Sequence, residues 1–306
     1  MVKDLKRDFL TLMDLSSEEI ELILKRAIEL KSGKDADKCP LIGKSIGLLL
    51  EKSSTRTRVS LEVGIYQLGA QAIYMSPKDT QIGRGETIHD TAKVLSRYLD
   101  AVVMRTDSHN ILIEFASHSS IPIINGLSDL HHPCQILADL MTILEKKGRL
   151  KDIKLTYIGD GNNVANSLIE AASLMGLNLV MACPKGYEPD PDILKKAKAL
   201  SDSRIVIMTD PRVAADNSDV VYTDVWISMG QEKEAANKKQ NFTEYQLNNK
   251  LLSYARKDAI VLHCMPAHRG EEITDEVIDG PQSVIFDQAE NRLHTQKALL
   301  EFLLAG

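Results

Sequence analysis

The chain has 306 residues, of which 43% are hydrophobic and 26% charged, and its formal net charge is −6. This composition is that of a soluble globular protein, and the length suggests two domains of roughly 150 residues each. The negative charge argues against a surface built mainly for nucleic acid, and no apolar run approaches the ~18 residues of a membrane span.

The four cysteines, Cys39, Cys134, Cys183 and Cys264, are widely separated and form no CxxC pair. In a chain of this length, that pattern indicates free thiols in a reducing compartment. The first sixteen residues, MVKDLKRDFLTLMDLS, mix charged and apolar residues and lack the uninterrupted apolar stretch of a signal peptide. We therefore expect a cytoplasmic protein.

The first half of the chain alternates predicted helices and strands. A helix is expected over 16–31, where a serine precedes early glutamates and apolar residues recur at helical spacing. A short buried strand is expected over 45–50, followed by a helix with Leu61, Ile65 and Leu68 on one face. Further strands are expected over 71–75, 100–105 and 121–126, and further helices over 87–99 and 131–148.

The pattern restarts with a strand–helix–strand unit over 152–184. Strands are then expected over 204–210, 219–226 and 259–266, and a terminal helix over 291–306. Strands that alternate with helices indicate parallel sheets with helices on both faces. The sequence therefore predicts an α/β protein of two Rossmann-like domains, 1–148 and 149–306.

A polar stretch from Ser53 to Arg58 directly follows the strand expected over 45–50. It places several hydroxyl groups and Arg56 at a helix N-terminus, where backbone N–H groups and the helix dipole favour an anion. An arginine can also bind phosphate through two hydrogen bonds. The spacing is not that of a glycine-rich Walker loop. The alternative is an ordinary capped helix start, with Arg58 paired to Glu62 four residues on.

Two further segments carry groups that suit an anion or a carbonyl. Arg105 ends the strand expected over 100–105, although a single arginine there is more often a surface residue. His132 and Gln135, three residues apart, can converge on one point. His131 and Cys134 raise the possibility of zinc, but no second ligand pair at zinc spacing accompanies them. We therefore expect no metal.

The segment YIGDGNNVANS (157–167) partly matches a dinucleotide fingerprint. Gly159 and Gly161 fit the first two glycines, but Val164 stands at the third, and no acidic residue follows the next strand. The fingerprint fails at both points, so NAD is not expected and no cofactor is predicted. Asn163 stays a candidate for hydrogen bonding a polar ligand.

Two late segments, DVWISMG (224–230) and HCMPAHRG (263–270), begin at the ends of the strands expected over 219–226 and 259–266. Asp224, Ser228 and Met229 belong either to a capped turn or to a loop that folds over a ligand bearing an amine. Cys264 could form a nucleophilic pair with His268, but the local sequences of papain-like and caspase-like enzymes are absent.

Six motifs together resemble the aspartate/ornithine carbamoyltransferase family: STRTR, MRT, HPCQ, GDGNN, DVWISMG and HCMPAHRG. They occur in the family's order, and the resemblance runs from about residue 6 to the end of the chain. SMG after Asp224, and HC followed by PAHRG, resemble the ornithine branch, whereas the aspartate branch usually carries a proline-leucine-arginine segment in the latter place. Met265 stands where the ornithine branch usually has leucine; the family uses this residue's backbone carbonyl, and the two side chains have similar volumes.

The resemblance implies two substrate sites. The carbamoyl phosphate site would contain Ser54, Thr55, Arg56, Thr57, Gln81, Arg105, His132, Pro133, Cys134, Gln135, Cys264, Met265 and Arg292. The ornithine site would contain Asn163, Asp224, Ser228 and Met229, and the catalytic group would be Arg105, His132, Asp224 and Cys264. Gln81 matches a family position at a subunit boundary.

The resemblance also implies a reaction and an assembly. The carbamoyl group of carbamoyl phosphate would pass to the side-chain amine of L-ornithine, giving L-citrulline and phosphate, in arginine synthesis or, in reverse, in arginine degradation. The family forms trimers with active sites at subunit interfaces, and the helix at about 290–306 would pack back on the first domain. The alternatives are a sibling transferase acting on putrescine, acetylated ornithine or aspartate, and a non-catalytic anion-binding relative.

Overall fold

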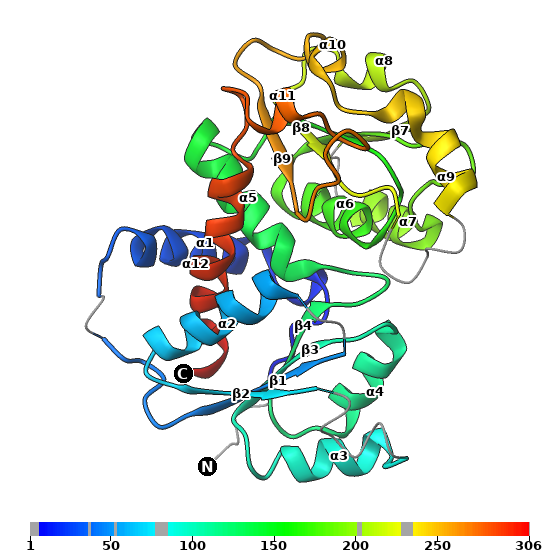
Figure 1. Ribbon diagram of the computed structural model, residues 1–306. Coiled ribbons are helices and arrows are strands. Elements are labelled where there is room, and N and C mark those ends of the chain that lie inside the picture. The colour runs from blue at the N-terminus through cyan, green and yellow to red at the C-terminus, as the bar shows by residue number, and fades with distance from the viewer. Residues whose placement is uncertain are drawn as a thin grey trace. The chain divides into compact units, whose positions relative to one another are not determined.

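The computed structural model describes residues 6–35, 38–51, 54–76, 85–200, 204–227 and 235–305 (Figure 1). The chain divides into two compact units. Unit 1 comprises Met1–Ala138 and Asn291–Gly306, and unit 2 comprises Asp139–Glu290.

The described residues of unit 1 form a four-stranded parallel sheet in the order β2-β1-β3-β4. The strands are β1 (Ser45–Leu50), β2 (Gln71–Met75), β3 (Ala101–Arg105) and β4 (Ile123–Leu127). In the β1–β3 register Leu50 lies opposite Arg105, so both strands end at the same edge of the sheet. Ligands of open parallel sheets bind beyond this carboxyl edge, and the polar stretch that begins α2 follows it directly.

The helices of unit 1 flank this sheet, with α3 and α4 on one side and α1, α2 and α12 on the other (Figure 1). Their bounds are α1 (Ser17–Lys31), α2 (Thr55–Gln67), α3 (Ile88–Leu95), α4 (His109–His118), α5 (Pro133–Lys147) and α12 (Ile285–Leu304), with a short 3₁₀ helix η1 (Leu12–Asp14) before α1. Helices α5 and α12 each run from one unit into the other. The predicted face of Leu61, Ile65 and Leu68 is buried.

The C-terminal helix packs on α1 and α2, as the resemblance implied. Arg26 of α1 donates to Glu301 at 3.0 Å, and Ser60 of α2 donates to Gln296 at 2.7 Å. Gly64 lets α2 approach α12 closely, because a Cβ atom at this position would lie 3.2 Å from Lys297 Cγ. The helix begins at Ile285, six residues before the predicted start at 291; Ile285 is fully buried, so packing stabilises the added turns.

The described residues of unit 2 form a five-stranded parallel sheet in the order β7-β6-β5-β8-β9. The strands are β5 (Lys154–Ile158), β6 (Asn178–Ala182), β7 (Ile205–Met208), β8 (Val220–Thr223) and β9 (Ile260–His263). The strand order reverses between β5 and β8, which is the position where open α/β sheets bind ligands. Ile158 lies opposite Thr223, and Thr223 lies opposite His263, so the loops after β5, β8 and β9 begin side by side.

Helices cover both faces of this second sheet, with α6 and α7 on one face and α8 and α10 on the other (Figure 1). Their bounds are α6 (Asn163–Met175), α7 (Pro191–Leu200), α8 (Pro211–Ala215), α9 (Ala235–Phe242), η4 (Thr243–Tyr245), α10 (Asn249–Leu252) and α11 (Asp275–Ile278). Helix α6 ends at Gly176, whose φ of 71° suits a left-handed C-cap. The predicted α/β class with two parallel sheets is confirmed.

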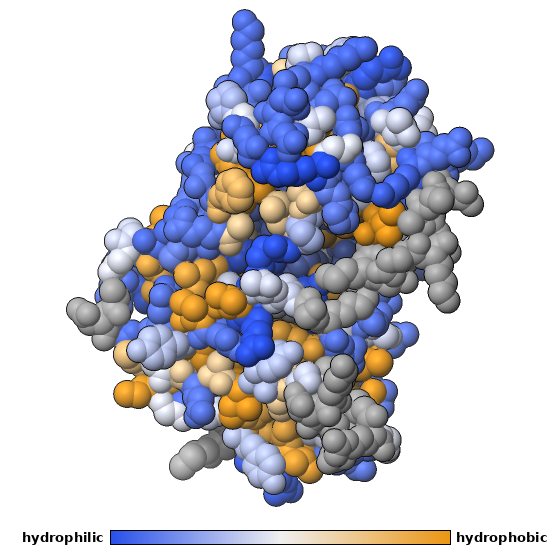
Figure 2. Space-filling model, in the orientation of Figure 1, coloured by the Kyte–Doolittle hydropathy of each residue, from blue (hydrophilic) through white to orange (hydrophobic). Residues whose placement is uncertain are grey.

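The face drawn in Figure 2 is mostly hydrophilic, with hydrophobic residues in small groups. On helix α2, the side chains of Val59, Val63 and Tyr66 are exposed, Tyr66 to 80%. In the described parts of the chain, no helix has both the length and the apolar character needed to cross a membrane.

Candidate functional site

In unit 1, the sequence from Ser54 to Thr57 forms the start of α2, directly after β1. Ser54 is the N-cap: its Oγ accepts a hydrogen bond from the backbone N–H of Thr57 at 3.3 Å. Thr55 is exposed and Arg56 half-buried on the first turn. A helix N-terminus with adjacent hydroxyl and guanidinium groups is suited to an anion. The pairing expected for an ordinary helix start is also present, because Arg58 Nε donates to Glu62 Oε1 at 2.9 Å.

Two buried arginines meet at the Thr57 hydroxyl group. Arg105, at the end of β3, donates to Thr57 Oγ1 at 3.3 Å, and Arg292, on α12, donates to it at 2.9 Å. Thr57 is 0% exposed, and the two arginines are 5% and 3% exposed. Two buried guanidinium groups at the start of α2 add positive charge beside the helix N-terminus, which favours an anion there.

His132 and Gln135 lie at the start of α5 and are both buried. Burial first, and then the charges of Arg292 and Arg105, hold the pKa of His132 well below its ordinary value. His132 is therefore a neutral imidazole at pH 7, able to donate one hydrogen bond and accept another. Unit 1 thus brings together the predicted Thr57, Arg105, His132 and Arg292.

Cys134 and Pro133, also predicted for this site, are buried at the first turn of α5. Cys134 Sγ donates to the Asn125 backbone carbonyl at 3.3 Å, and burial raises the pKa of this thiol to about 12. A thiol held protonated in this way packs as a small apolar group rather than acting as a nucleophile or metal ligand.

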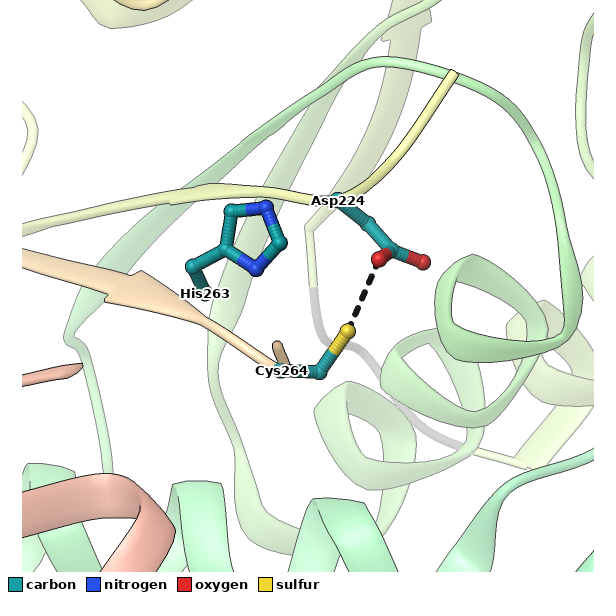
Figure 3. A group of neighbouring side chains, drawn as sticks. All are labelled: Asp224, His263 and Cys264. Atoms are coloured by element: carbon teal, nitrogen blue, oxygen red, sulfur yellow. Dashed lines mark hydrogen bonds between the residues drawn. The ribbon is translucent and has the colours of Figure 1, made fainter. Parts of the chain in front are cut away.

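In unit 2, Asp224 and Cys264 lie side by side, because β8 and β9 are neighbours and each residue directly follows its strand. Cys264 Sγ donates to Asp224 Oδ1 at 2.8 Å (Figure 3). The backbone N–H of Val225 donates to the same oxygen at 2.7 Å. Asp224 is 5% exposed, and Cys264 is half-buried. Asp224 Oδ1 therefore accepts two hydrogen bonds, one from a side chain and one from the backbone.

Asn162 contacts Asp224, although the sequence had pointed to Asn163. The Asn162 Nδ2 donates to Asp224 Oδ2 at 2.7 Å, while its Oδ1 accepts from the backbone N–H groups of Val164 and Ala165. Asn163 is the first residue of α6 and is half-buried. Asparagine is among the preferred N-cap residues, but that preference applies equally to Asn162 and Asn163 and could not have told them apart.

His263 is a second residue that the sequence did not indicate. Its Nδ1 accepts from the backbone N–H of Met265 at 2.9 Å, and its Nε2 bonds to Glu272 Oε1 at 3.0 Å. Met265 has a φ of 57° and precedes a cis peptide bond to Pro266. The imidazole therefore holds the turn that follows Cys264, whereas His268 is an exposed residue of the next loop.

A buried ion pair joins the loop that follows β5 in unit 2 to helix α9. Lys238 Nζ on α9 lies 2.6 Å from Asp160 Oδ2, and the two side chains are only 6% and 11% exposed. The ammonium group also lies 5.3 Å from the centre of the Tyr187 ring, within cation–π range. Burial is the main cause that raises the pKa of Asp160, Lys238 opposes it, and Asp224 adds to it.

Two groups of described side chains have metal-binding atoms within 4.8 Å of one another: Asp224, His263 and Cys264, and His268, Glu271 and Glu272. In the first group both imidazole nitrogens and the thiol already have the protein partners named above. The sequence-based expectation of no metal stays a prediction. Gln81, Ser228 and Met229 lie outside the described residues.

Family models match both parts of the chain. Residues 7–145 match the "Aspartate/ornithine carbamoyltransferase, carbamoyl-P binding domain", and residues 151–303 match the "Aspartate/ornithine carbamoyltransferase, Asp/Orn binding domain".

Individual relatives match over nearly their whole length. An ornithine carbamoyltransferase of Syntrophus aciditrophicus is 54% identical over 302 residues, covering 98% of this chain and 100% of the relative. One from Halalkalibacterium halodurans is 53% identical over 305 residues, covering 98% and 96%. The solved ornithine carbamoyltransferase of Pyrococcus furiosus is 48% identical, covers 100% of this chain and 99% of its own, and superposes with a TM-score of 0.94.

Proposed function

This chain belongs to the aspartate/ornithine carbamoyltransferase family, and from that membership we propose how its residues carry out the reaction of the ornithine branch. The activity is that of an ornithine carbamoyltransferase: the carbamoyl group of carbamoyl phosphate passes to the side-chain amine of L-ornithine, giving L-citrulline and phosphate. The observation that carries the assignment of residues is the pair of buried arginines at the Thr57 hydroxyl.

Residues 1–148 form the carbamoyl phosphate domain. The phosphate binds at the first turn of α2, to Ser54, Thr55, Arg56 and Thr57, where backbone N–H groups and the helix dipole complement its charge. The leaving group is a good one, so the site needs no metal or organic cofactor. The site neutralises the charge of the phosphate and positions the substrate for attack.

Negative charge develops on the carbonyl oxygen when the amine attacks. Arg105, His132 and Thr57 are the donors for this oxygen, with Gln135 and Arg292 beside them. The lowered pKa of His132 supports this role, because a neutral imidazole can donate a hydrogen bond without adding a third buried positive charge. Preorganised donors of this kind often supply most of an enzyme's rate enhancement. Pro133, Cys134, Cys264 and Met265 are carried over to the carbamoyl phosphate set from the family pattern.

Residues 149–306 form the ornithine domain, where Asn163, Asp224, Ser228 and Met229 bind the amino acid. The ornithine side-chain amine has a pKa near the lysine value of ~10.4, so roughly one molecule in a few thousand is neutral at pH 7. Asp224 and Cys264 orient this amine and take part in removing its proton. The amine nitrogen then bonds to the carbamoyl carbon, and the bond from that carbon to the phosphate oxygen breaks.

Citrulline formation tests this function directly. Purified protein with carbamoyl phosphate should give citrulline from L-ornithine and far less carbamoylated product from putrescine, acetylated ornithine or aspartate. A preference for putrescine or acetylornithine would assign a sibling activity, and absence of turnover with every acceptor would leave a non-catalytic anion-binding protein.

We also propose a trimer, or a multiple of trimers, with active sites shared between subunits. Val59, Val63 and Tyr66 are exposed on α2, the helix whose first turn binds the phosphate. An exposed apolar group on that helix supports a subunit contact next to the site. Sedimentation velocity should give three subunits or a multiple, and mixing inactive Gln81→Ala and Asp224→Ala proteins should restore part of the activity only if subunits share sites.

The cytoplasmic location is a proposal as well. All four cysteines are free thiols, and Cys39 is exposed, which is consistent with a reducing compartment. Cell fractionation with an antibody against the chain tests it.

A further inference from the structure

We propose that Asn162 is a positioning residue that fixes the Asp224 carboxylate for ornithine, a role distinct from its capping of α6. This inference rests on the proposed function of Asp224 in binding the amine. It starts from the side-chain amide of Asn162, which makes hydrogen bonds in two directions.

The first direction determines which way the amide points. Asn162 Oδ1 accepts from Val164 N at 2.9 Å and from Ala165 N at 3.2 Å, and in a side-chain amide the oxygen is the acceptor whereas the NH₂ group only donates. The NH₂ group must therefore lie on the other side, where it is 2.7 Å from Asp224 Oδ2. The N-cap geometry thus determines that Asn162 presents a donor to Asp224.

The second direction completes the environment of Asp224. Its Oδ1 accepts from Cys264 Sγ and Val225 N, and among the described residues Asn162 is the one that donates to Oδ2. Without Asn162, the carboxylate could rotate about its Cβ–Cγ bond, and one oxygen would lose its donor. A group that binds an ammonium or amine must have its oxygens aimed before the ligand arrives.

Two substitutions separate this role from capping. Serine and aspartate are N-cap residues as good as asparagine, so a purely structural Asn162 predicts that Asn162→Ser and Asn162→Asp keep normal kinetics. We expect Asn162→Ser, which retains the cap but cannot reach Asp224, to lower kcat/KM for ornithine by about ten- to a hundredfold, as for losing a hydrogen bond to a charged group. KM for carbamoyl phosphate should stay within about twofold of the wild-type value, because the Asn162 amide is directed at Asp224 and at α6 rather than at the carbamoyl phosphate set.

Asn162→Asp should lower kcat/KM for ornithine more than Asn162→Ser does, and it should also change the dependence of kcat/KM on pH. It keeps the oxygen that caps α6 but sets a second carboxylate against Asp224 Oδ2. Two carboxylates this close share one proton, which raises the pKa of one of them. The acidic limb of kcat/KM for ornithine should therefore shift to higher pH by about one unit or more, a change that loss of a cap would not produce.

Asn248 provides the matched control. It is the N-cap of α10, with its side chain accepting from Leu251 N at 3.0 Å and donating to Gln246 rather than to Asp224. Asn248→Ser should leave kcat/KM for ornithine unchanged. Wild-type KM and pH profile in Asn162→Asp would overturn the proposal, as would losses in Asn162→Ser that fall equally on both substrates. Failure of the wild-type protein to make citrulline would instead reject the proposed function itself.

Discussion

The guanidinium group of Arg292 donates to the Thr57 hydroxyl oxygen at 2.9 Å, although the two residues are 235 positions apart in the sequence. The contact exists because α12 packs on α2, where Gly64 allows a close approach to Lys297. A helix formed by the last residues of the chain therefore supplies a charge to the site at the beginning of α2.

Removing the Thr57 hydroxyl should lower kcat/KM for carbamoyl phosphate. Thr57→Val keeps the shape of the side chain but removes the oxygen to which Arg105 and Arg292 donate. We expect kcat/KM for carbamoyl phosphate to fall by about 10²–10³-fold, as when one oxyanion donor is lost. Thr57→Ser restores the hydroxyl and should recover most of the activity in steady-state assays. Near-normal kinetics in the valine variant would exclude Thr57 as a donor to the carbonyl oxygen.

Arg56 and Arg58 make a pair of variants two residues apart on the same helix. If Arg56 binds the phosphate, Arg56→Ala should weaken carbamoyl phosphate binding by about 2–4 kcal/mol, the cost of a lost charge-assisted contact. Arg58 donates to Glu62 at the surface and lies 4.0 Å from the centre of the Tyr74 ring. Arg58→Ala should therefore change binding by less than about 1 kcal/mol. Calorimetric titration compares the two, and equal affinities would contradict the phosphate assignment.

The rate should rise with pH at fixed total ornithine. The neutral amine fraction increases about tenfold per pH unit below its pKa of ~10.4, so activity should climb from pH 6 to pH 8. His132 should not add an acidic limb in this range, because burial and the two arginines hold its pKa well below the usual value. Initial rates of citrulline formation across this range test the prediction, and a flat profile would count against attack by the neutral amine.

Acid should destabilise unit 1 through His109. Its Nδ1 lies 2.9 Å from Ser128 Oγ, and burial, with a smaller effect of His131, lowers its pKa to about 4. The unfolded chain, with a histidine pKa near ~6.5, binds the proton more readily, so stability is lost as the pH falls from about 6.5 to about 4. Urea unfolding gives the free energy of unfolding of the wild type and of His109→Gln at several pH values. That free energy should depend less on pH in the variant than in the wild type, and equal dependence in both would contradict the prediction.

Strand and helix positions followed from the sequence because they depend on local patterns. The strand predicted over 45–50 is β1 itself, and the serine predicted to precede the first helix, Ser16, caps α1. The same reasoning placed Arg105 and Cys264 at strand ends, and parallel registers then brought neighbouring strand ends together.

Contacts between distant side chains could not be predicted in this way. The bond from Asn162 to Asp224 depends on which asparagine of the pair caps α6, and the bond from His263 to Glu272 depends on the path of a loop. Periodicity carries no information on either. The early start of α12 at Ile285 has the same origin, because tertiary burial of that residue outweighed the local pattern.

Replacing only one member of the ion pair between Lys238 and Asp160 should lower the free energy of unfolding strongly. Both side chains are nearly inaccessible to water, and the oxygen and nitrogen lie 2.6 Å apart. Lys238→Met leaves a buried carboxylate without its cation, so unfolding free energy should fall by about 3–5 kcal/mol.

Adding Asp160→Asn to Lys238→Met should recover much of that loss, because the double variant buries no charge in place of the pair. Urea unfolding of the wild type, both single variants and the double variant gives the coupling energy of a complete cycle. A Lys239→Met variant is the control, since Lys239 pairs at the surface with Glu271 and should contribute less than about 1 kcal/mol. Additive losses in the Lys238 and Asp160 variants would mean that the two charges do not stabilise one another, and that each acts through its separate packing against the surrounding side chains.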